Sequence, residues 1–100
     1  MRPLLALLLL AACASPDRAF WGAEEGRVTF DGRDYAVYVD RDRAQPRVQV
    51  IRLGYARRGQ HEAILADMPR AAEAVSGCAL VAGSVQGDSG VMTARLDCGG

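Results

Sequence analysis

Few residues in this chain have side chains that do chemistry, and they are widely spaced. His61 is the only histidine, so no pair of imidazoles is available to hold a metal ion. Three carboxylates fall on one expected helix at spacings that do not bring them to a single face, namely Glu62, Asp67 and Glu73. No glycine-rich phosphate loop follows an expected strand. The sequence therefore predicts no metal site and no cofactor.

A second candidate is the run Gly87-Asp88-Ser89-Gly90, which resembles the start of the segment around the nucleophile of trypsin-like serine proteases. The resemblance ends at Val91, which stands where that family has glycine. The chain is also too short for the two β-barrels that position the histidine and aspartate of those enzymes. Glycine, aspartate and serine are residues that tight turns use, so we expect a turn here.

Cys78 and Cys98 form either a disulfide or a metal-binding or redox pair. The close spacing that is typical of metal-binding and redox pairs is missing here. If Gly87-Asp88-Ser89 is a three-residue hairpin loop, the facing pairs are Gln86 with Gly90, Ala82 with Ala94, Leu80 with Leu96, and Cys78 with Cys98. Directly opposed residues of antiparallel strands are close enough for a disulfide. The same register gathers the apolar residues on one face. We therefore predict a structural disulfide that stabilises the fold by about 3 kcal/mol.

The N-terminus resembles the leader of a bacterial lipoprotein precursor. Met1-Arg2-Pro3 carries one positive charge, and an apolar run from Leu4 to Leu10 is interrupted only by Ala6. That run is about half the ~20 residues needed to cross a bilayer, which indicates a cleaved signal. Leu10-Ala11-Ala12-Cys13 is similar to the lipobox of that family. The alternative is an ordinary secretory signal cut after a triplet such as Ala12-Cys13-Ala14.

The resemblance implies that residues 1–12 are removed and that Cys13 carries a diacylglycerol, usually with further acylation by chains such as palmitate. Two or more acyl chains anchor a protein stably, so the membrane is an expected partner. Ala14 follows the cysteine, where aspartate commonly retains Gram-negative lipoproteins in the inner membrane. This implies the periplasmic face of the outer membrane. Assigning Cys13 to the lipid also leaves Cys78 and Cys98 as a pair.

Residues 13–26 are expected to be the lipidated cysteine and a flexible tether, because they are polar and contain Pro16 and two glycines. Phe20 and Trp21 interrupt this tether. Either both rings cover an edge of the core, or they contact the membrane or a partner protein.

The sequence pattern of residues 27–100 predicts one small α+β domain. It has about five antiparallel strands in the order β-β-β-α-β-β and a helix on one face of the sheet. The turn at Asp31-Gly32 pairs Phe30 with Arg33 and Val28 with Tyr35, giving a hairpin over 27–40 with one buried face. Residues 41–46 read as a solvated loop and residues 47–53 as a third strand.

The expected helix covers residues 61–76 and ends at Gly77. Its apolar stripe is Ile64, Leu65, Met68, Ala71, Ala72 and Val75. Pro69 predicts a kinked or two-piece helix, because proline removes a helical hydrogen bond.

The chain has 12 basic and 12 acidic residues, and this balance predicts no nucleic-acid partner. We expect a small lipid-anchored envelope protein that is a non-catalytic interaction or structural module with a protein partner. The alternative is a periplasmic inhibitor of an exogenous hydrolase of lysozyme or protease type. The candidate contact residues are Phe20, Trp21, Tyr55, Arg57 and Arg58, although an exposed loop also explains the last three.

Overall fold

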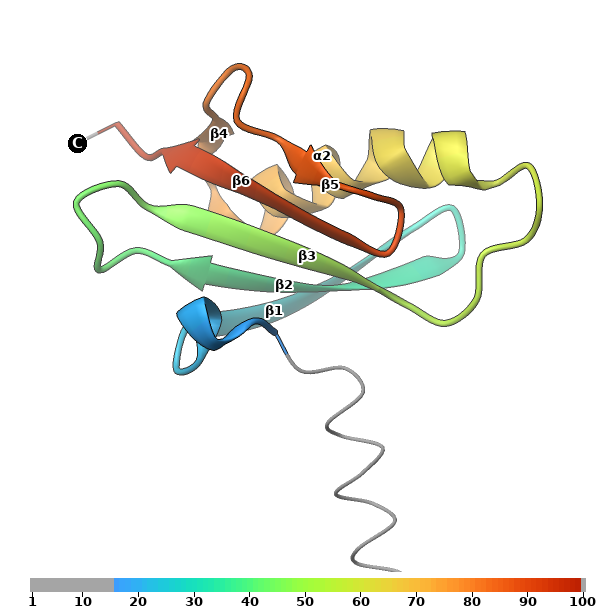
Figure 1. The fold of residues 1–100 in the computed structure, drawn as a ribbon, viewed down its shortest axis with the longest axis horizontal. Helices are drawn as coiled ribbons and strands as arrows, with labels where there is room; N and C mark the ends of the chain where they lie inside the picture. The colour runs from blue at the N-terminus through green and yellow to red at the C-terminus, as the bar shows by residue number, and fades with distance from the viewer. Residues whose placement is uncertain (1–15, 100) are drawn as a thin grey trace, which may run out of the picture.

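The computed structural model describes residues 16–99, so the predicted lipobox and Cys13 lie outside the described residues. The elements are η1 (Arg18–Phe20), β1 (Glu24–Phe30), β2 (Arg33–Asp40), β3 (Arg47–Leu53), α2 (His61–Ser76), β4 (Ala79–Leu80), β5 (Gln86–Gly87) and β6 (Val91–Asp97). One antiparallel sheet has the order β1-β2-β3-β6-β4, and β5 also pairs with β6 (Figure 1). The predicted α+β fold is confirmed. Among residues 16–99, no helix is both long and apolar enough to cross a bilayer.

The β1–β2 hairpin has the predicted register, with Phe30 opposite Arg33 and Val28 opposite Tyr35. Asp31 and Gly32 both have positive φ, of 52° and 77°, as a two-residue type I′ turn requires. β1 begins at Glu24, three residues before the hairpin that the sequence predicts.

The main core lies between α2 and one face of the sheet. Its buried members on the strands are Tyr35, Val37, Val39, Val48, Val50, Met92, Ala94 and Leu96, and those on the helix are Ile64, Met68, Ala71 and Ala72. Val48 and Val50 therefore point to the helix, while Ile51 points to the opposite face. The predicted helical stripe is correct except for Leu65, which is 48% exposed.

α2 is one element from His61 to Ser76 that runs through Pro69, so the predicted single helix is confirmed and the two-piece alternative is wrong. Buried residues on both sides of Pro69 pack against the sheet, and this packing outweighs one lost backbone hydrogen bond. Gly77 ends the helix as predicted, with φ of 72° and an N–H that donates to the Glu73 carbonyl.

α2 lies close against β1 at Gly26. A Cβ at this position would lie 2.5 Å from Cγ1 of Val75. Gly26→Ala is therefore expected to lower the free energy of unfolding by about 1–3 kcal/mol, because the core has no room for the added methyl group. Chemical denaturation measures this loss. The double variant Gly26→Ala, Val75→Ala is expected to lose less than the sum of the two single variants, and strict additivity would contradict the contact.

The opposite, outer face of the sheet is also covered, which corrects the expectation of a single buried face. Phe20 packs there with Ala36, Tyr38 and Ile51 as a second cluster. β2 is consequently buried on both faces from Tyr35 to Val39. The described part of the expected tether, residues 16–26, is thus a folded segment that contains η1 and the start of β1.

The C-terminal hairpin confirms the disulfide and corrects part of its register. Cys78 and Cys98 are bonded, with Cα atoms 4.6 Å apart, and Leu80 faces Leu96. Ala82 does not face Ala94. The chain turns at Gly83, and the Ser84 hydroxyl accepts the Arg95 N–H at 3.0 Å in place of a strand carbonyl.

β5 then resumes the pairing in a shifted register, with Gln86 opposite Thr93 and Gly87 opposite Met92. The predicted turn follows, and the Asp88 side chain accepts the N–H groups of Gly90 and Val91 at 2.8 and 3.0 Å. These two hydrogen bonds, the one from Val91 foremost, lower the pKa of Asp88 from its ordinary value.

Candidate functional site

The segment Pro16–Trp21 is attached to the outer face of the sheet through a buried glutamine. Gln49 is fully buried, and its Nε2 donates to Oδ2 of Asp17 at 2.9 Å. The N–H of Asp17 donates in return to Oε1 of Gln49 at 2.9 Å. Because an unpaired buried amide is unfavourable, this reciprocal pair fixes Asp17 on β3.

Two arginines hold the turn that follows. The Arg47 guanidinium lies 5.7 Å from the centre of the Phe20 ring, within the range of a cation–π contact. Arg43 donates from Nη2 to the Ala19 carbonyl at 3.2 Å and from Nε to Oδ2 of Asp40 at 2.6 Å. The turn is therefore held by side chains from β3 and from the loop before it.

Phe20 and Trp21 have different surroundings, although the sequence treats them as a pair. Phe20 is 2% exposed, as expected for a ring that covers the core, whereas Trp21 is 67% exposed. The Trp21 indole Nε1 donates to the Pro16 carbonyl at 3.3 Å, and the Arg18 guanidinium lies 5.7 Å from its ring. Trp21 is thus an exposed aromatic ring beside the first described residue.

The remaining predicted contact residues lie elsewhere. Tyr55 is 100% exposed, and Arg57 and Arg58 are also exposed, in the loop between β3 and α2. Arg47, beside η1, and Leu53, before this loop, are at opposite ends of β3, a distance of about 20 Å at 3.3 Å per residue. The candidate residues therefore lie in two separate places, and Figure 1 shows the 3-10 turn before β1 and the loop between β3 and α2 at opposite ends of the sheet.

The structure brings His61 and Ser89 together, which sequence reasoning missed because it treated them separately. Nδ1 of His61 lies 2.5 Å from Oγ of Ser89. Arg52 holds the Ser89 turn at this end of the sheet, since its Nη1 donates to the Ser89 carbonyl at 2.9 Å and its N–H to that of Gly90 at 2.9 Å.

An imidazole nitrogen beside a serine hydroxyl can accept its proton, as in nucleophilic catalysis. Asp88, the residue before Ser89, uses its Oδ1 to accept the N–H groups of Gly90 and Val91. Those two donors are consequently not free to stabilise an oxyanion. In the described part of the chain, the pair is an exposed hydrogen bond that joins the start of α2 to the Ser89 turn.

Asp67 is the main polar residue that the helical stripe missed. It is 3% exposed and lies 3.2 Å from Nη2 of Arg33 and 3.3 Å from Nη1 of Arg70. Asp67 is three residues after Ile64 and four before Ala71, and this spacing places it on the buried face of the helix. The spacing is the sequence signal from which its burial could have been predicted. The ion pair with Arg33 connects α2 to the β1–β2 turn.

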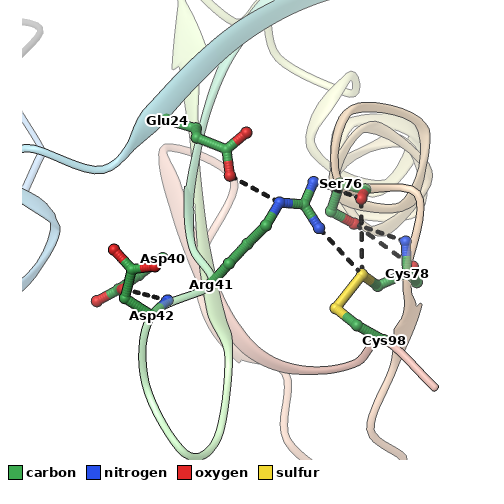
Figure 2. Close-up of polar contacts among 7 residues, drawn as sticks. All are labelled: Glu24, Asp40, Arg41, Asp42, Ser76, Cys78 and Cys98. Carbon is green, nitrogen blue, oxygen red and sulfur yellow. Dashed lines mark hydrogen bonds and ion pairs between the residues drawn. A yellow bond between two sulfur atoms is a disulfide. The ribbon is translucent and has the colours of Figure 1, made fainter. Parts of the chain in front are cut away.

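Arg41 connects the disulfide to the rest of the fold (Figure 2). Its Nη2 donates to the Ser76 carbonyl at 2.6 Å, its Nη1 lies 3.4 Å from Sγ of Cys78, and its Nε donates to Glu24 at 2.7 Å. A cation at the last carbonyls of a helix is favourable. Arg41 was expected in a solvated loop, and the structure instead places it across the end of α2.

Within residues 16–99, no group of three or more histidine, cysteine or acidic side chains is arranged to hold a metal ion. Comparisons of this chain with protein-family models, with curated proteins and with solved structures found no match.

Proposed function

We propose that this protein is a small lipoprotein, anchored through a lipid on Cys13 to the periplasmic face of the outer membrane, that binds a protein partner without catalysis. The lipobox residues Leu10-Ala11-Ala12-Cys13 support the anchor. The Cys78–Cys98 disulfide supports an exported location, because disulfides persist in oxidising compartments.

The observation that carries this proposal is the attachment of Pro16–Trp21 to the sheet. Pro16 is three residues from Cys13, and three extended residues span at most about 11 Å. Since Asp17 and Phe20 are fixed on the domain, a lipid on Cys13 holds the whole domain against the membrane surface.

The loop between β3 and α2 supplies the partner surface in this proposal. Tyr55 is fully exposed there, and the exposed residues Arg57 and Arg58 follow it in the chain. Tyrosine and arginine are enriched among the residues that dominate binding energies at protein interfaces. Because this loop is separated from η1 by the length of β3, the protein can be anchored and bound to a partner at the same time.

Photo-crosslinking in intact cells tests the partner surface. A photoreactive residue in place of Arg57 is expected to give one discrete protein adduct, identified by mass spectrometry. The matched probe replaces Glu73, which is also exposed but lies on α2. No adduct at Arg57, or identical adducts at both positions, would refute the partner surface.

Inhibition of an exogenous hydrolase is a second candidate, favoured by the fully exposed Tyr55 on a loop. An inhibitor presents such a residue to the cleft of an enzyme. If this function is correct, the purified protein slows a lysozyme or a trypsin-like protease at a stoichiometric concentration, and Tyr55→Ala removes the inhibition. Unchanged activity of both enzymes would exclude them as targets.

A further inference from the structure

A groove of about 540 Å³ on the protein surface is lined by three arginines and by no carboxylate. Its lining residues are Arg43, Ala44, Gln45, Arg47, Gly83, Ser84, Gln86, Thr93, Ala94 and Arg95. Arg43 is paired with Asp40. Arg47 and Arg95 form no ion pair with any residue of the described chain.

Arg47 and Arg95 are direct partners across the β3–β6 pair. Like charges that face each other on neighbouring strands destabilise a sheet. Two arginines that are strand partners, line one groove and have no neutralising carboxylate therefore indicate an external anion. Guanidinium groups bind phosphate with paired hydrogen bonds.

The groove lies beside the segment that leads to Cys13. Thr93, which lines it, is the strand partner of Gln49, and Gln49 holds Asp17. Arg47, which also lines it, covers the ring of Phe20. The proposed lipid is attached within about 11 Å of Pro16, so this side of the domain lies next to the headgroups.

We propose that the Arg43–Arg47–Arg95 groove binds the phosphate of anionic phospholipids in the leaflet that holds the Cys13 lipid. This inference rests on the proposed anchor. Arginines close to an anionic leaflet favour binding of a protein to that leaflet. Tryptophan is typical of the membrane–water interface, and the exposed Trp21 lies there in this arrangement. The lipidated domain is then oriented on the bilayer by its outer face.

The test uses the full lipidated protein, reconstituted into vesicles of phosphatidylcholine alone or mixed equally with phosphatidylglycerol. Trp21 is the only tryptophan, so quenching of its fluorescence by brominated acyl chains measures contact with the bilayer. We expect stronger quenching in the anionic vesicles, weakening as salt is added.

Arg95→Gln is the informative variant, because Arg95 is exposed and its guanidinium has no ion pair among the described residues. In anionic vesicles this variant is expected to lower about five-fold the ratio of protein whose outer face contacts the bilayer to protein whose outer face does not, as measured by Trp21 quenching. Arg70→Gln, which removes the same charge from the exposed side of α2 on the other face of the sheet, is expected to leave the ratio unchanged.

The outcomes separate the two proposals. Protein that does not float with the vesicles refutes the anchor, and with it this inference. If the protein floats with the vesicles but Trp21 quenching is the same in the neutral and the anionic vesicles, or the same in the two arginine variants, the inference is overturned. The anchor is then left intact. A photoreactive residue at position 95 that captures a protein in cells overturns it in favour of an acidic partner.

Discussion

Cys98→Ser is expected to lower the free energy of unfolding by about 3 kcal/mol. The disulfide joins residues 20 positions apart and ties the end of α2 to the end of β6, which restricts the unfolded chain. For a domain of this size, such a loss lowers the melting temperature by roughly 10–20 °C. Cys98 is the better position to change because it is exposed, whereas Cys78 is buried and its replacement would also disturb packing.

Calorimetry under oxidising and reducing conditions measures this effect. The wild-type protein with reductant is expected to melt close to Cys98→Ser, and reductant is expected to leave the variant unchanged. If Cys98→Ser has the same melting temperature as the oxidised wild-type protein, the disulfide does not stabilise the fold.

Phe20→Ala is expected to have a comparable effect, a loss of about 3 kcal/mol, because its buried ring covers Ala36, Tyr38 and Ile51. Trp21→Ala is the matched control. It removes the adjacent and larger ring, yet its expected effect is within about 0.5 kcal/mol, since Trp21 is mostly exposed. Urea denaturation of the three proteins measures both changes.

Limited trypsin digestion gives a second measurement of the same segment. Arg18 lies within η1, so cleavage after it requires the segment to leave the sheet. Phe20→Ala is expected to accelerate this cleavage, while Trp21→Ala leaves its rate close to that of the wild type. Equal losses of stability in the two variants would show that Phe20 does not hold the segment on the sheet.

Local signals made much of the fold predictable. The Asp31-Gly32 turn set the register of the first hairpin, and the spacing of Cys78 and Cys98 agreed with the apolar alternation around them. Both signals act between neighbouring strands, where turn geometry and side-chain alternation determine the pairing.

The errors arose where a distant polar group changed the local pattern. Asp67 is buried on α2, where its carboxylate pairs with Arg33, 34 positions away, whereas the apolar Leu65 is exposed. Ser84 interrupts the last hairpin because its hydroxyl satisfies the Arg95 N–H, which lets the chain leave the ladder and rejoin it in another register. Neither pairing is visible in hydrophobic periodicity.

The candidate site was only partly predictable for the same reason. The local composition was enough to predict that Tyr55 lies in an exposed loop. The different surroundings of Phe20 and Trp21 could not be predicted in this way, because they depend on Gln49 and Arg47 of a strand far along the chain. The arginine groove exists only because β3 pairs with β6, and strand order is not determined by the sequence pattern.

Intact-mass analysis of the protein from envelope fractions tests whether a lipid on Cys13 holds this domain at a membrane. We expect a mature N-terminus at Cys13 that carries a diacylglycerol on its sulfur, with the mass of a further acyl chain. A mature chain with an unmodified Cys13 thiol, or one cut after Ala14, would contradict the anchor.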